Sequence, residues 1–147
     1  MEVAFTPITI NFLDFPSYQS PAFIKAIHSA MHDRGLALIE NIDLTEKQYV
    51  DLTNNLGSAL NIPLFLTLGK LPGFPEIARV ANFPADGEAI DMNYKFGNYW
   101  HHDGNFWPPG DNHILNMLHC KIPAAKGGKT GVLSTKMGYK YLSEAVK

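Results

Sequence analysis

Two short motifs in the second half of the chain contain residue types that can bind a metal ion and an anion. Residues 99–103 read YWHHD, and residues 126–130 read KGGKT. If residues 99–106 form a strand, the side chains of His101 and Asp103 project to the same side, about 6 to 7 Å apart along the backbone. Imidazole and carboxylate are two of the three ligands of a facial 2-His-1-carboxylate Fe(II) site. A closed zinc site takes four ligands, often thiolates, and this chain has a single cysteine. The motif therefore predicts an iron site that needs one further histidine.

The remaining histidines are predicted to have other roles. His102 points to the opposite face of the predicted strand, where it lies near the ligands and substrate or simply packs in the core. Structural or solvated roles are expected for His28 and His32 on a predicted helix and for His113 and His119 beside an apolar stretch. A His-x-Asp triplet arises by chance in roughly a third of chains of this composition, so its meaning depends on the surrounding sequence.

That surrounding sequence forms a pattern that covers nearly the whole chain. Residues 100–106 (WHHDGNF) are followed by a Pro-containing loop, an apolar stretch at 114–122 and residues 123–130 (PAAKGGKT). In combination these segments resemble the TauD/TfdA family of Fe(II)- and 2-oxoglutarate-dependent dioxygenases. Residues 32–57 resemble the family's N-terminal strand and helix, and residues 138–147 resemble the helix that follows its Gly-Gly-x-Thr strand.

The resemblance implies a role for each matching residue. His101 and Asp103 would be the first two iron ligands, and Thr130 would hydrogen-bond a carboxylate of 2-oxoglutarate. The reaction would be oxidative decarboxylation of 2-oxoglutarate by O2, coupled to oxidation of a small-molecule C–H bond. Three further residues would face the substrate: His102, Asn105 and Phe106.

The chain also departs from the family pattern. Lys129 stands where an acidic or small residue is common, and the expected strand at residues 130–135 (TGVLST) lacks the family's usual acidic residue after Thr130. The distal histidine and the arginine that pairs with the far carboxylate of 2-oxoglutarate have no counterpart, because Arg34 and Arg79 both precede the motif. We therefore expect a partner chain to supply both residues, in a heterodimer or, as the next choice, in a homodimer. Such a chain is expected to be inactive alone.

Two other classes of function remain open. The first is a non-catalytic structural or regulatory subunit of a dioxygenase-like complex, in which His101 and Asp103 bind no iron. The second is a metal site built within this chain from His101, Asp103 and one of His102, His113 or His119. That second site requires three of these side chains to converge on one point.

Composition is typical of a soluble globular domain, which we predict to be a single domain over residues 1–147. The chain is 46% hydrophobic and 18% charged, with a net charge of -2, which gives no electrostatic reason to bind nucleic acid or anionic membrane. The N-terminus lacks a basic segment before an apolar run, and no apolar stretch reaches about 18 residues, so we expect neither secretion nor membrane spanning. Cys120 is expected to be buried, in a cytoplasmic protein.

Local signals predict helices first and strands later, which gives an α/β (α+β) fold class. Ser20 and Pro21 begin a helix that ends at Gly35, and Thr45 with Gln48 begins a second helix that ends at Gly57. An irregular, lid-like segment is expected at residues 58–75 because it is rich in Pro and Gly. Strands are expected at residues 36–42, 76–82, 94–106, 113–122 and 130–135. With the resemblance, these strands suggest a partial double-stranded β-helix of the jelly-roll (cupin-like) class, completed by a second chain.

Overall fold

The structure is a computed structural model that describes residues 6–60, 70–80, 99–103 and 115–147. The chain forms two compact units. The first unit comprises residues 1–44 and 120–147, and the second comprises residues 45–119. Mixed α/β structure is confirmed, since the elements include helices, a parallel strand pair and an antiparallel strand pair.

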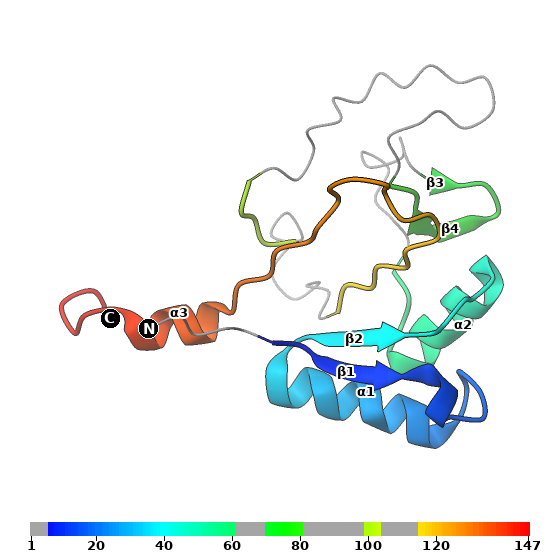
Figure 1. Cartoon of the computed structure of the whole chain (residues 1–147), viewed down its shortest axis with the longest axis horizontal. Coiled ribbons are helices and arrows are strands. Elements are labelled where there is room, and N and C mark those ends of the chain that lie inside the picture. The colour runs from blue at the N-terminus through cyan, green and yellow to red at the C-terminus, as the bar shows by residue number, and fades with distance from the viewer. Residues whose placement is uncertain (1–5, 61–69, 81–98, 104–114) are drawn as a thin grey trace, which may run out of the picture. The chain divides into compact units, whose positions relative to one another are not determined.

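The first unit is built around a β-α-β motif. Strand β1 (Ile8–Asn11) pairs in parallel with β2 (Ala37–Glu40), and helix α1 (Pro21–Arg34) connects them and packs against both (Figure 1). Parallel strands require such a crossover because the chain must return to the same end of the sheet. The strand expected at residues 36–42 is confirmed as β2. Strand β1 was missed by the sequence reasoning, and a short 3-10 helix, η1 (Phe12–Asp14), follows it.

Helix α1 begins and ends at the residues that its sequence signals predicted. The Ser20 hydroxyl accepts a hydrogen bond from the backbone N–H of Phe23 at 3.3 Å, and Pro21 occupies the first helical position, where no donor is required. Gly35 ends the helix in the left-handed conformation, with φ of 72°, which glycine adopts without steric cost.

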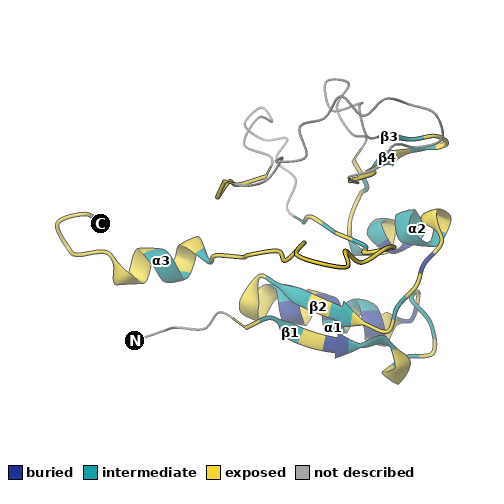
Figure 2. Ribbon diagram, turned by 45° about the horizontal axis from the view of Figure 1, so that its top comes forward, coloured by how far each residue is buried: buried dark blue, intermediate teal, exposed yellow. Residues whose placement is uncertain are grey.

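The apolar core of the first unit lies between α1 and the strand pair. Phe23, Ile27 and Ala30 are spaced along one face of α1 and are buried, as Figure 2 shows for the helix face toward the strands. Ile10 of β1 is buried with them. The ring of Phe23 also contacts two aromatic rings of the segment after β1, with centroids 5.2 Å apart in each case. Burial of side chains of this size stabilises a fold by roughly 1.5 to 3 kcal/mol each.

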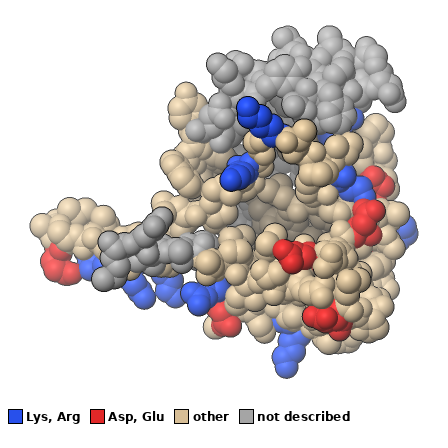
Figure 3. Space-filling model, viewed as in Figure 1, with Lys and Arg blue, Asp and Glu red and all other residues tan. Residues whose placement is uncertain are grey.

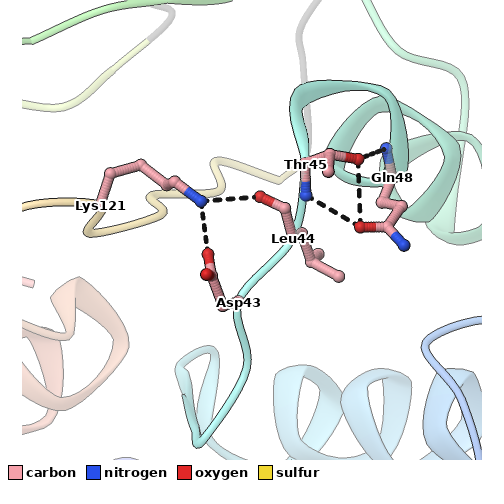
Figure 4. Close-up of polar contacts among 5 residues, drawn as sticks. All are labelled: Asp43, Leu44, Thr45, Gln48 and Lys121. Atoms are coloured by element: carbon pink, nitrogen blue, oxygen red, sulfur yellow. Dashed lines mark hydrogen bonds and ion pairs between the residues drawn. The ribbon is translucent and has the colours of Figure 1, made fainter.

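The second unit contains helix α2 (Glu46–Leu56) and a β-hairpin. The predicted capping box is confirmed: the Thr45 hydroxyl accepts from the Gln48 backbone N–H, and the Gln48 side chain accepts from the Thr45 N–H (Figure 4). The hairpin joins β3 (Lys70–Leu71) to β4 (Phe74–Ala78), which packs against α2. Its turn is Pro72-Gly73, with Gly73 at φ of 83°, as a type II turn requires. The strand expected at 76–82 therefore begins earlier, inside the segment expected to be irregular.

Three other predicted strands are wrong wherever the structure describes them. Residues 99–103, 115–122 and 130–134 form neither strand nor helix. Helix α3 (Thr135–Tyr141) begins where the last strand was expected to end, because the Ser134 hydroxyl accepts from the Met137 N–H at 3.3 Å and caps it. That helix begins three residues before the range expected, 138–147, and ends inside it at Tyr141. No jelly roll is present among the described residues.

Helix hydropathy, surface charge and the single cysteine can each be compared with the expectations from composition. None of the helices in the described part of the chain is long and apolar enough to cross a membrane. Acidic and basic side chains both occur on the face shown in Figure 3, in keeping with the net charge of -2. Cys120 is exposed, so the prediction that it is buried is wrong.

Candidate functional site

His101 and Asp103 contact each other within the short segment 99–103. The Nε2 atom of His101 lies 3.2 Å from Oδ1 of Asp103, and more than half of each side chain is exposed. The predicted strand is absent here, so strand alternation is not what brings them to one side. The contact arises instead from an irregular backbone with a turn at Asp103.

The hydrogen bond on the other side of the imidazole determines what Nε2 can do. His101 Nδ1 lies 2.8 Å from the backbone carbonyl oxygen of Tyr99. A carbonyl oxygen only accepts, so Nδ1 carries the proton of this bond, and in the neutral ring Nε2 is left with a lone pair. That lone pair then faces a carboxylate oxygen, which is also an acceptor. Such an arrangement is stabilised when positive charge, either a second ring proton or a metal cation, lies between the two atoms.

The spacing of the two atoms also fits metal ligation. Two ligand atoms bound at about 2.1 Å and at right angles to each other on one metal are separated by about 3.0 Å. The observed separation of 3.2 Å is close to that value. A neutral imidazole nitrogen and a carboxylate oxygen are moreover the donor types of a non-haem Fe(II) site. This pair therefore has both the chemistry and the spacing of two adjacent ligands.

Asn116 is a site neighbour that the sequence reasoning missed. Its side-chain amide Nδ2 donates a hydrogen bond to Oδ2 of Asp103, the oxygen that does not face His101. The two residues are 13 positions apart in the sequence. A signal was available, because Asn116 is a polar residue inside the apolar stretch that was expected to form a strand.

Helix α2 fixes the segment that carries Asn116. The Tyr49 hydroxyl donates to the backbone carbonyl of Met117 at 2.6 Å, and the Tyr49 ring stacks on the imidazole of His119, with centroids 5.6 Å apart. The Thr53 hydroxyl lies 3.6 Å from the Met117 sulfur. Burial raises the pKa of Tyr49 to about 12. The structural role expected for His119 is consistent with this stack.

In the first unit, the two glycines of the KGGKT motif give the backbone an unusual conformation just before Thr130. Gly127 and Gly128 both adopt positive φ, of 78° and 70°, which L side chains rarely adopt. A Cβ on Gly128 would also lie 3.1 Å from the Cβ of Ala124. Thr130 follows directly and is exposed. The glycine pair thus determines how the backbone reaches the threonine.

An ionic contact in the first unit holds the chain just before this motif. The ammonium group of Lys121 pairs with the Asp43 carboxylate and donates to the Leu44 carbonyl oxygen at 2.9 Å (Figure 4). Leu44 itself is buried. Lys121 therefore ties the segment that leads to the KGGKT motif to the loop after β2.

The other predicted site residues are not brought to this pair by the described structure. His102 is exposed, whereas Asn105, Phe106 and His113 lie outside the described residues. His28 and His32 are exposed on α1, as expected. Among the residues that the structure describes, no three His, Cys, Asp or Glu side chains converge as a metal site would require. The described residues thus provide no metal site completed by His102 or His119.

Comparison with known proteins gives one family. The family model described as "Taurine catabolism dioxygenase TauD, TfdA family" matches residues 3–147. No solved structure matches the chain. The match begins before β1 and continues through both motifs to the last residue, and so includes every described element. The chain belongs to the TauD/TfdA family.

Proposed function

We propose that this chain is a subunit of a non-haem Fe(II)- and 2-oxoglutarate-dependent oxygenase that oxidises a C–H bond of a small molecule. Membership of the TauD/TfdA family implies a function of the dioxygenase type. The assignment to particular residues depends on the contact between His101 and Asp103. The two candidate ligand atoms, Nε2 of His101 and Oδ1 of Asp103, lie 3.2 Å apart. The other ring nitrogen of His101, Nδ1, donates a hydrogen bond to the Tyr99 carbonyl oxygen.

Each residue then has a defined task. His101 Nε2 and Asp103 Oδ1 would hold Fe(II), which when bound supplies the redox chemistry with O2 and 2-oxoglutarate. The Tyr99 carbonyl keeps the proton on Nδ1 and so keeps Nε2 available as a ligand. Thr130 donates a hydrogen bond to a carboxylate of 2-oxoglutarate. Substrate contacts are assigned to three residues: His102, Asn105 and Phe106.

The third iron ligand and the arginine for 2-oxoglutarate are proposed to come from a second chain. Large apolar side chains support this proposal, because Leu118, Ile122 and Leu133 are 80%, 72% and 66% exposed. Leu38 of β2 is also 47% exposed, although parallel strands are normally covered on both faces. A partner that completes a jelly-roll barrel would cover such surfaces, in an interface on the order of 2,000 Å² or more. A heterodimer is preferred, and a homodimer is the alternative.

The ligand assignment is tested by measuring Fe(II) binding without oxygen. His101→Ala and Asp103→Ala are each expected to abolish binding and turnover while the fold is retained, because two ligands of a facial site do not retain the metal against water. His28→Ala, at an exposed position of α1, is the matched control. Equal iron content in the wild type and in both ligand variants would refute the assignment.

The 2-oxoglutarate assignment is tested at Thr130. Thr130→Val keeps the shape of the side chain and removes the hydroxyl. A hydrogen bond to a charged carboxylate contributes about 1.5 to 3 kcal/mol. The concentration of 2-oxoglutarate needed for half-maximal turnover should therefore rise by roughly 10- to 100-fold. An unchanged concentration dependence would remove Thr130 from the site.

The partner is tested by light scattering together with an assay of 2-oxoglutarate consumption. The chain alone is expected to self-associate and to be inactive, and purification from its native source should recover a second chain that restores activity. A well-behaved monomer with full activity on its own would contradict the proposal.

A non-catalytic structural or regulatory subunit is the second candidate function. It is favoured by one observation, namely that no third ligand joins His101 and Asp103 within the described part of the chain. The Fe(II) titration separates the two candidates. A non-catalytic subunit would bind no iron through His101 and Asp103 even with its partner present.

A further inference from the structure

We propose that Asn116 is a positioning residue for the metal site, which holds Asp103 in the orientation that leaves Oδ1 free to bind Fe(II). This inference rests on the proposed function. Its basis is that the two oxygens of Asp103 have separate partners: Oδ2 accepts from the Asn116 amide, and Oδ1 faces Nε2 of His101. The carboxylate is thus held from one side while its other oxygen points to the candidate metal position.

The physical reason is the freedom of an exposed carboxylate. More than half of the Asp103 side chain is accessible to solvent, so without a partner it samples several rotamers and exchanges its two oxygens. An ionised carboxylate only accepts hydrogen bonds, and the amide NH2 of asparagine only donates them. Their pairing therefore selects one orientation before the metal arrives. Hydrogen bonds that orient metal ligands in this way typically change metal affinity or activity by 10- to 100-fold.

Asn116 can act in this way because its own backbone is held by α2. Residues 115, 117 and 119 are half-buried, whereas residues 116 and 118 are exposed. The half-buried positions include Met117, whose carbonyl accepts from the Tyr49 hydroxyl, and His119, which stacks on the Tyr49 ring. The alternation presents Asn116 on the side away from these contacts. Helix α2, which supplies no ligand, thereby fixes the residue that orients a ligand.

The experiment measures Fe(II) affinity anaerobically in the full chain, in complex with its partner where one is recovered. Asn116→Leu keeps the branched shape of the side chain and removes the donor, and it is expected to weaken Fe(II) binding about 10- to 100-fold. Asn116→Gln retains an amide and should restore most of the affinity. Asn55→Leu, at an exposed position near the end of α2, should leave the affinity unchanged.

A second measurement detects the hydrogen bond without metal. In ¹⁵N-labelled protein, the side-chain NH2 resonances of Asn116, assigned by their loss in Asn116→Leu, should shift in Asp103→Ala and not in Asn55→Leu. A dispersed spectrum and an unchanged Tm for Asn116→Leu show that the variant is folded, so a loss of affinity is not a loss of structure.

The outcomes separate this inference from the proposed function. If His101→Ala and Asp103→Ala lose Fe(II) while Asn116→Leu binds it as the wild type does, the role of Asn116 is overturned and the proposed function stands. If neither ligand variant changes Fe(II) binding, the proposed function is overturned and the role of Asn116 with it. Weaker binding in Asn116→Leu with recovery in Asn116→Gln supports both.

Discussion

Removal of the Tyr49 hydroxyl tests how helix α2 holds residues 115–119, the segment that carries Asn116. Tyr49→Phe deletes this one oxygen and leaves the ring that stacks on His119. The lost interaction is the 2.6 Å hydrogen bond to the Met117 carbonyl. Such a hydrogen bond typically contributes about 1 kcal/mol to the free energy of unfolding. In the variant, the Met117 carbonyl loses its donor while it stays partly buried, and this adds to the loss of stability. We expect Tyr49→Phe to lower the free energy of unfolding by about 1 to 2 kcal/mol at pH 8.

The same residue predicts a specific dependence of stability on pH. In the unfolded chain the phenol has its ordinary pKa of about 10, whereas burial raises the pKa of Tyr49 to about 12 in the folded protein. Between these values the folded state retains a proton that the unfolded state has lost. The free energy of unfolding therefore falls as pH rises in this range. The contribution is fully present below pH 10 and is lost as pH passes about 12.

The size of the pH effect follows from the two pKa values. One pKa unit corresponds to about 1.4 kcal/mol, and the full shift would give about 2.7 kcal/mol. Since Tyr49 is only partly shielded from solvent, we expect about 1 kcal/mol between pH 8 and pH 11. Tyr49→Phe has no phenol at this position, so its free energy of unfolding does not fall by this amount. The stability difference between wild type and variant should accordingly shrink by about that amount.

Urea unfolding followed by circular dichroism at pH 8 and pH 11 measures both effects. Tyr141→Phe, at an exposed position of α3, is the control for tyrosines that are not buried. Contributions of all other groups to the pH dependence cancel when wild type and variant are compared at each pH. A wild-type advantage over Tyr49→Phe that is the same at pH 8 and pH 11 would refute the role assigned to the half-buried Tyr49 hydroxyl.

Two further predictions concern the chain around the KGGKT motif. Gly128→Ala should lower the free energy of unfolding by about 1 to 2 kcal/mol, because alanine is strained at positive φ and its Cβ would meet Ala124 at 3.1 Å. Gly127→Ala has the same backbone strain and nothing within 4 Å, so urea unfolding should show a smaller loss, and equal losses would contradict the steric argument. Lys121→Met should cost about 1 kcal/mol or less, since the side chains of its ion pair are 49% and 85% exposed. This cost should shrink in high salt, whereas Lys140→Met should show no comparable effect.

Features that depend on neighbours within about four residues could be predicted from the sequence. Ser20 with Pro21 and Gly35 defined both ends of α1, and Thr45 with Gln48 defined the start of α2, because each signal is a hydrogen bond or a backbone preference local to the helix end. The two motifs, together with the segments around them, likewise suggested the TauD/TfdA family, to which the chain belongs.

Contacts between residues far apart in the sequence depend on how the chain packs. Strand β1 was missed because four residues give little pattern of their own and are stabilised by β2, which follows a whole helix later. The apolar stretch at 115–119 has the alternation of a strand, yet the Met117 carbonyl accepts from a tyrosine 68 positions away. The contact of Asn116 with Asp103 depends on that placement. Periodicity specifies which side chains share a face, and packing determines what that face touches.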